Sequence, residues 1–186
     1  MQHRSDHGYS RHDDRRDDRR DDRRDDRRGR GTPLSDLDPA LTSVSRQVIG
    51  AAIEVHKTLG PGYPEAAYTK ALCQELDGHG ISYQSDASLP IRYKDKDIGT
   101  TSADLFVDGR FIVEVMAHTG DVGSSERSAL RAQLRSADVE LGLIINFGER
   151  RLKDGLVRVL NPDKLNAMRG ESEHDDEGDE GDEYEN

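Results

Sequence analysis

The sequence has few of the residues that build disulfide scaffolds, zinc sites and membrane spans. Its 186 residues include one cysteine, Cys73, and no tryptophan. A single cysteine excludes a framework of intrachain disulfides and the cysteine-rich sites of zinc ribbons and fingers. Apolar runs stay well short of the ~18 residues of a transmembrane helix, and the first residues lack the apolar core of a secretory signal. We therefore expect a cytoplasmic protein that does not interact with membranes.

Charge is distributed unevenly along the chain. Lys and Arg number 27 against 38 Asp and Glu, which gives a net charge of −11. Residues 1–31 hold 11 Arg and 9 Asp, whereas residues 171–186 hold 10 Asp and Glu and no Lys or Arg. The balance left for residues 32–170 is about −3. This middle segment therefore lacks the strongly basic character that is typical of a nucleic-acid-binding domain.

The middle segment, residues 32–170, is expected to form one domain, because it holds almost all apolar residues and has the usual length of one. Residues 13–28 repeat Asp-Asp-Arg-Arg four times, and residues 171–186 are acidic with interspersed glycine. Neither segment has apolar side chains to bury, so we expect residues 1–31 and 171–186 to be disordered. The arginines also allow an arm that binds nucleic acid, although the interleaved Asp opposes this. The acidic tail could mimic a phosphate backbone in cis.

The spacing of apolar residues predicts two helices followed by a sheet. A helix over about 43–59 and a second over about 64–76 flank Gly60-Pro61-Gly62. The apolar period then changes to two, which is typical of strands. Pro90 places its strand at an edge of the sheet. Strands are expected at 81–83, 89–93, 103–107, 111–115, 143–147 and 156–160, with a helix at 126–138. This order indicates a sheet flanked by helices, in an α/β or α+β fold.

Two acidic residues lie inside apolar strands. Asp104 occurs in Ser-Ala-Asp-Leu-Phe-Val and Glu114 in Phe-Ile-Val-Glu-Val-Met-Ala. A carboxylate among β-branched residues costs free energy unless it is paired, hydrogen-bonded or bound to a cation. Two of them on adjoining strands favour a site for Mg²⁺ or Mn²⁺, with Glu65 at the start of the second helix as a third ligand. In the alternative interpretation, Glu65 only complements its helix dipole and the two strand carboxylates face solvent.

The loop between these two strands, at Asp108-Gly109, decides whether the carboxylates meet. Side chains along a strand alternate between the two faces of the sheet. A two-residue turn puts Asp104 and Glu114 on opposite faces. A three-residue loop, over either 107–109 or 108–110, puts them on the same face. A metal site therefore requires one of the three-residue loops or a compensating bulge.

One stretch carries a motif of glycine, glutamate and tyrosine. It runs from Gly62 through Glu65 to Tyr68, and further matching positions extend over about residues 44–160. In this motif and the ordered positions after it, the sequence resembles the bacterial GxxExxY protein family, which looks like a branch of the PD-(D/E)XK nuclease superfamily. The resemblance implies a restriction-endonuclease-like α/β core in the order α-β-β-β-α-β, with a central mixed sheet flanked by helices. It also implies a Mg²⁺-dependent or Mn²⁺-dependent site for phosphodiester hydrolysis of DNA.

The resemblance also implies roles for individual residues. Glu65 corresponds to the carboxylate of the helix, Asp104 to the motif aspartate, and Glu114 to the glutamate of the (D/E)-x-K element. Gln133 corresponds to the glutamine of the helix that follows. The three carboxylates would hold the metal ion.

Met116 is the main departure, because it stands where the family has the motif lysine. A methionine side chain has neither a charge nor a proton to offer a reacting phosphate. An arginine in the lysine's place would not act as a general base near neutral pH. Two functions remain open: a nuclease whose activity is weak or lost, and a non-catalytic module that binds nucleic acid or a protein partner. The cations that could replace the lysine are His118, Arg127, Arg131, Lys94 and Lys96.

Overall fold

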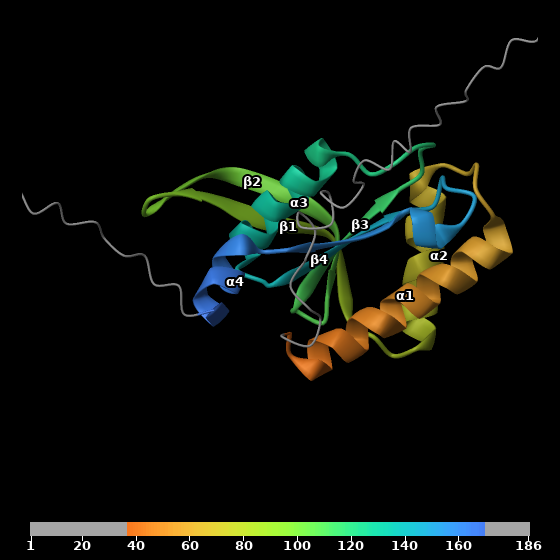
Figure 1. Cartoon of the computed structure of the whole chain (residues 1–186), viewed down its shortest axis with the longest axis horizontal. Helices are drawn as coiled ribbons and strands as arrows, with labels where there is room; N and C mark the ends of the chain where they lie inside the picture. Colours follow the sequence, from red (N-terminus) through yellow and green to blue (C-terminus); the bar gives the residue numbers. More distant parts are fainter. Residues whose placement is uncertain (1–36, 170–186) are drawn as a thin grey trace, which may run out of the picture. The chain divides into compact units, whose positions relative to one another are not determined.

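The structure is a computed structural model, and it describes residues 37–169. The predictions for residues 1–31 and 171–186 lie outside the described residues. A five-stranded sheet in the order β1-β2-β3-β4-β5 forms the centre of the domain (Figure 1). The elements in chain order are α1 (Pro39–Leu59), α2 (Glu65–Gly78), β1 (Tyr83–Tyr93), β2 (Lys96–Val107), β3 (Phe111–Met116), α3 (Ser124–Ala137), β4 (Leu141–Asn146), the 3₁₀ helix η2 (Leu152–Asp154), β5 (Leu156–Leu160) and α4 (Pro162–Arg169).

The sheet is mixed because α3 connects β3 to β4 as a crossover. β3 and β4 are parallel, whereas the other neighbouring strands are antiparallel. Parallel neighbours need such a crossover, since a tight turn can join only antiparallel strands. The helices α1 and α2 contribute to one apolar cluster, and Leu130 and Leu134 of α3 contribute to a second. The core order α-β-β-β-α-β and the mixed sheet flanked by helices confirm the expected fold class.

The first helix begins four residues earlier than the sequence pattern indicates. Asp38 is the N-cap, and its carboxylate accepts a hydrogen bond of 2.8 Å from the backbone N–H of Ala40. Pro39 occupies the first helical position, where its missing N–H costs nothing. The expected start near residue 43 is wrong because Leu41 is buried and Thr42 is helical and buried as well. The helix ends at Gly60, whose φ of 65° suits glycine.

β1 and β2 form a hairpin that is longer than the sequence predicts. The two short strands expected at 81–83 and 89–93 are one strand, and β2 begins at Lys96 instead of residue 103. Residues 91–100 are exposed, so this part of the hairpin shows no apolar alternation and is held by backbone pairing. Pro90 lies in β1, which is an edge strand as predicted.

The C-terminal part of the domain contains two elements that the sequence analysis did not anticipate, the 3₁₀ helix η2 and the helix α4. The short helix α4 follows β5, and the side chain of Asn161 accepts a hydrogen bond of 3.1 Å from the N–H of Asp163 at its start. All six residues of β4 are buried, as its apolar run predicts. Within residues 37–169, no helix combines the length and the apolar composition needed to cross a membrane.

Candidate metal centre

The loop between β2 and β3 brings the two strand carboxylates to the same face of the sheet. Val107 pairs with Phe111, so the loop consists of residues 108–110. Both Asp108 and Gly109 have positive φ values, of 53° and 63°. Continued from Leu105 and Val113, this register sets Asp104 opposite Glu114. The even register that a metal site requires is therefore confirmed.

Backbone hydrogen bonds tie the two carboxylates to each other's strand. The N–H of Val115 donates to Oδ2 of Asp104 at 2.7 Å, and the N–H of Asp104 lies 3.4 Å from Oε1 of Glu114. Both side chains are half-buried. Their positions therefore follow from the strand pairing and require no mobile segment.

A cavity of about 230 Å³ collects the residues that the sequence analysis named. Glu65 from α2 and Gln133 from α3 line it together with Asp104, Glu114 and Met116. Gln133 is buried, its Nε2 donates to the carbonyl oxygen of Ser102 at 2.8 Å, and its Oε1 has no hydrogen-bond partner. Residues from four elements, separated in sequence, thus share one small cavity.

Burial and mutual repulsion make these carboxyl groups harder to ionise. Burial, followed by the charge of Asp104, raises the pKa of Glu114 to about 7. Burial also raises the pKa of Asp104, while the hydrogen bond from Val115 opposes this rise. The pKa of Glu65 is raised by burial and by Asp104 and is lowered by His118. A group that favours its neutral form in a cavity is typical of a site where a cation would restore the charge.

Two further acidic residues lie at this site and were missed by the sequence analysis. Asp86 of β1 raises the pKa of Asp104 through its charge, and it borders a neighbouring cavity of about 580 Å³ together with Glu65. The backbone φ of Asp86, 49°, is unusual within a strand. Nothing in the sequence around Asp86 indicates this conformation. Glu126, in the first turn of α3, lines the smaller cavity. In the sequence, a glutamate in the first turn of a helix resembles any other surface charge.

Among the described residues, neither lysine nor arginine lines the carboxylate cavity. The side chain at the lysine position, Met116, packs partly against the apolar cluster under α3. Of the cations considered as replacements, His118 acts on Glu65 through its charge. Lys94, Lys96, Arg127 and Arg131 do not border the cavity.

The pair Asp104 and Glu114 has the chemistry of a Mg²⁺ site. Mg²⁺ binds through one or two carboxylates and retains several waters. The buried Oε1 of Gln133, which has no partner, is an acceptor that such waters can satisfy. Among residues 37–169, however, no three or more His, Cys, Asp and Glu side chains are grouped tightly enough to hold a metal ion together. The residues present therefore fit a site with two protein carboxylates and water, with Glu65 in the same cavity.

A comparison with protein families agrees with this arrangement. The model of the PD-(D/E)XK nuclease superfamily matches residues 42–159, which is more than half of the chain. The matched range contains Glu65, Asp86, Asp104, Glu114 and Glu126. The chain belongs to the PD-(D/E)XK nuclease superfamily.

A comparison with solved structures gives one match. The chain is similar to an alkaline exonuclease from Laribacter hongkongensis, with 14% sequence identity and a TM-score of 0.36. The match covers 68% of this chain and 88% of that chain. No curated protein matches the sequence.

Proposed function

We propose that this domain has the metal-dependent phosphodiester hydrolysis of DNA as its ancestral chemistry, and that Met116 leaves this activity weak or lost. The observation that carries the proposal is the pair Asp104 and Glu114, set opposite each other across β2 and β3 in a cavity shared with Glu65 and Gln133. We further propose the GxxExxY family as the branch of the superfamily to which the chain belongs, on the basis of the motif from Gly62 to Tyr68.

Asp104 and Glu114 would hold Mg²⁺ or Mn²⁺ together with bound water, and Glu65 would add a third carboxylate to the same cavity. When bound, the ion would supply Lewis-acid polarisation of the phosphate and a more acidic water. The chain's own contribution is to keep the two strand carboxylates fixed by backbone hydrogen bonds. Gln133 contributes a side-chain amide that lowers the pKa of the Glu114 carboxyl group.

Met116 explains why the activity would be low. The residue lines the cavity two positions after Glu114, on the same face of β3. A cation there would stabilise the negative charge that develops on the phosphate, and loss of one such group typically costs on the order of 10²–10³ in rate. Methionine cannot replace this contribution.

The decisive experiment is a cleavage assay with Mg²⁺ or Mn²⁺ on single-stranded, duplex and branched DNA. We expect trace or undetectable cleavage by the wild-type protein and a gain on the order of 10²-fold for Met116→Lys. Met116→Leu is the matched control, because it changes the side chain without adding a charge. Robust wild-type cleavage that Glu114→Gln abolishes would show instead that another cation, with His118 the nearest candidate, has taken over the role.

Metal binding can be measured separately from cleavage by thermal unfolding in Mn²⁺. We expect millimolar Mn²⁺ to raise the Tm of the wild-type protein, because the ion binds the folded carboxylate pair and not the unfolded chain. Asp104→Asn should remove this rise. Asp95→Asn, at the exposed end of the hairpin, is a matched control and should keep it. An equal rise for wild type and Asp104→Asn would exclude these carboxylates as the metal site.

A second function is favoured by the absence of lysine and arginine from the cavity walls within the described residues. A non-catalytic module that binds nucleic acid or a protein partner needs only the scaffold. In that case Mn²⁺ would leave the Tm unchanged, and Met116→Lys would gain no cleavage activity.

A further inference from the structure

A second cavity lies between the β1–β2 hairpin and α3. It has a volume of about 430 Å³, and its walls include Ile91 and Arg92 of β1 and Ala132 and Arg135 of α3. The hairpin and α3 lie side by side in Figure 1. The cavity is a groove open to solvent, with one arginine on each wall. We refer to it as the hairpin groove.

The hairpin groove borders the carboxylate cavity. Ala129 and Gln133 line both of them, so one face of α3 runs from the groove to the two strand carboxylates. Gln133 donates to the backbone of β2 at Ser102 and thereby spans the space between helix and hairpin. An extended polymer bound in the groove would reach Asp104 and Glu114 while staying on the surface of α3.

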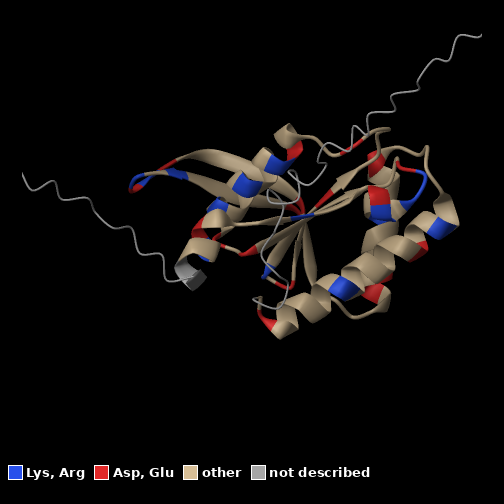
Figure 2. Cartoon of the chain, in the orientation of Figure 1, with Lys and Arg blue, Asp and Glu red and all other residues tan. Residues whose placement is uncertain are grey.

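The groove is basic, unlike the carboxylate cavity beside it. Its described walls carry two arginines and no acidic residue. Figure 2 shows the basic residues of α3 and of the outer end of the hairpin, where acidic residues accompany them. Nε of Arg92 lies 3.2 Å from Oδ1 of Asp97, and Nε of Arg135 lies 3.1 Å from Oδ2 of Asp163. All four side chains are at least half exposed, so these ion pairs are weak and phosphates can replace the carboxylates.

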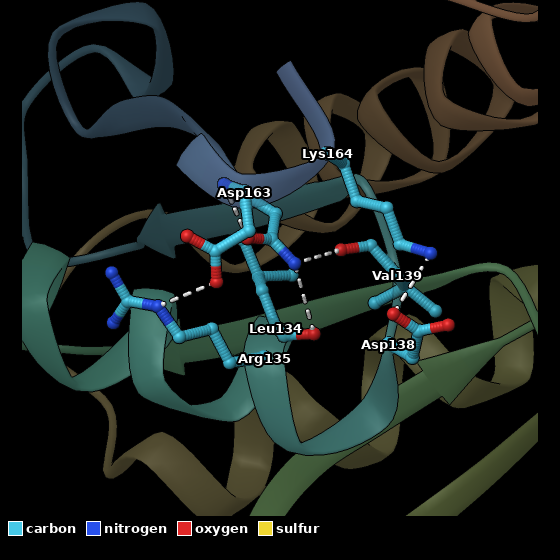
Figure 3. A network of polar contacts seen from close by, with 7 residues as sticks. Leu134, Arg135, Asp138, Val139, Asp163 and Lys164 are labelled. Carbon is cyan, nitrogen blue, oxygen red and sulfur yellow. Dashed lines mark hydrogen bonds and ion pairs between the residues drawn. The ribbon is translucent and has the colours of Figure 1, made fainter. Parts of the chain in front are cut away.

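A network of polar contacts at the C-terminal end of α3 fixes the helical wall of the groove, which carries Arg135. Figure 3 shows Arg135 paired with Asp163 and Lys164 paired with Asp138. The side-chain amide of Asn161 donates to the carbonyl oxygen of Val139 at 3.1 Å. These contacts join the C-terminal end of α3 to α4 and to Asn161, the residue before α4. The backbone at Arg135 is therefore set by the fold, while its exposed side chain can exchange Asp163 for a phosphate.

We propose that the hairpin groove binds a single strand of nucleic acid, with Arg92 and Arg135 on its phosphates, and directs it to the carboxylate cavity. This inference rests on the proposed function, since it assigns the path of that site's substrate. A groove of this volume has room for on the order of one nucleotide between its walls, and a duplex is too wide to enter it. The phosphates of a single strand need only a few fixed cations along such a path.

The outer hairpin also has an aromatic platform. The ring of Tyr93, next to Arg92, is 63% exposed, and Nζ of Lys94 lies 5.5 Å from its centre. Tyr93 does not line the groove but follows its last β1 residue, and an exposed aromatic ring there can stack an unpaired base of a strand that extends past the groove. A base pair inside a duplex does not present its face to such a ring. Tyr93 therefore also favours a single strand over a duplex.

The test is binding of the full chain to a fluorescein-labelled 20-nucleotide oligothymidylate, measured by fluorescence anisotropy in EDTA. Without metal, binding is observed independently of cleavage. We expect Arg92→Gln/Arg135→Gln to raise Kd on the order of tenfold at low salt, and to reduce the salt-dependence slope by about 1.4. Arg127→Gln/Arg131→Gln is the matched control, because it removes the same charge from α3 without touching the groove. It should change Kd less than twofold.

Two further comparisons complete the experiment. Tyr93→Ala should weaken binding several-fold, whereas Tyr63→Ala, which removes another exposed tyrosine, should not. A duplex of the same length should bind more weakly than the single strand. Absence of binding, equal loss in the groove and control variants, or tighter binding of the duplex would overturn the inference. Groove-dependent binding without any cleavage, even by Met116→Lys, would instead overturn the proposed hydrolysis and leave the groove assignment in place.

Discussion

The folded protein disfavours the ionised form of the Glu114 side chain, whose pKa is raised. This side chain extends from β3 among buried aliphatic residues, directly across from Asp104. In the absence of a cation, a carboxylate in this position destabilises the domain whenever it is ionised. The chain keeps this carboxylate even though the lysine position two residues later holds Met116. A site with this cost is consistent with a retained function for the carboxylate pair.

We expect the free energy of unfolding of the metal-free domain to fall as the pH rises from about 4.5 to 7. The pKa of Glu114 is raised to about 7 in the folded protein, so the folded state binds more protons than the unfolded state above about pH 4.5. Stability therefore falls between about pH 4.5 and 7, by up to about 3 kcal/mol from this group. Glu114→Gln should remove the loss and be more stable than wild type at pH 8 in EDTA, but not at pH 4.5.

Urea unfolding at the two pH values measures this difference. Glu54→Gln is the control, because Glu54 is exposed on α1 and its substitution should have little effect at either pH. A Glu114→Gln protein that is less stable than wild type at pH 8 would show that the ionised carboxylate is well compensated in the fold.

The central residues of the candidate site stand out in the sequence for a definite physical reason. Asp104 and Glu114 are conspicuous because they interrupt apolar strands, and a three-residue loop was required for them to meet. Asp86 was not identified, because only the folded domain brings its charge near Asp104. Glu126 was missed because acidic residues in the first turn of a helix are common on surfaces.

At the scale of elements, buried segments were easier to predict than exposed ones. The strand at 143–147 was recognisable because β4 is buried along its whole length. The first part of β2, residues 96–102, was missed, because its side chains are largely exposed and leave no alternating pattern. The short helix α4 was also missed; its Asn161 cap makes contacts that exist only in the folded domain.

The packing of α3 on the sheet can be tested at Gly142 of β4. A Cβ at Gly142 of β4 would lie 2.7 Å from a side-chain carbon of Leu130, which is fully buried in α3. We expect Gly142→Ala to destabilise the domain by about 1–3 kcal/mol, because Leu130 would have to move. It should also weaken any function that depends on where α3 places Gln133.

Gly50→Ala provides the matched comparison. Gly50 lies within α1, and a Cβ there would meet nothing within 4 Å. The substitution should therefore stabilise the domain by roughly 0.5–1 kcal/mol, because alanine loses less backbone entropy in a helix. Chemical unfolding should show a lower free energy of unfolding for Gly142→Ala and a higher one for Gly50→Ala, each relative to wild type. A lower value for both variants would show that the two positions do not differ in packing.

At the scale of the whole molecule, stability should reside in the middle of the chain. The only apolar side chains in residues 1–31 are those of Met1 and Tyr9, and residues 171–186 contain only Tyr184. So few apolar groups cannot offset a backbone entropy cost of about 1–2 kcal/mol per ordered residue. We therefore expect a protein consisting of residues 32–170 to unfold cooperatively.

The Tm of the protein consisting of residues 32–170 should lie within a few degrees of the Tm of the full chain. Calorimetry at two salt concentrations measures both values. The truncation changes the net charge from −11 to about −3, and the acidic residues it removes repel one another and the domain. At low salt the shorter protein should therefore have the slightly higher Tm. At 0.5 M salt the Debye length is only about 4 Å, so the difference should vanish. Loss of cooperative unfolding on truncation would show that the terminal segments pack on the domain after all. A lower Tm that persists at 0.5 M salt would identify apolar contacts, since charge interactions are screened under those conditions.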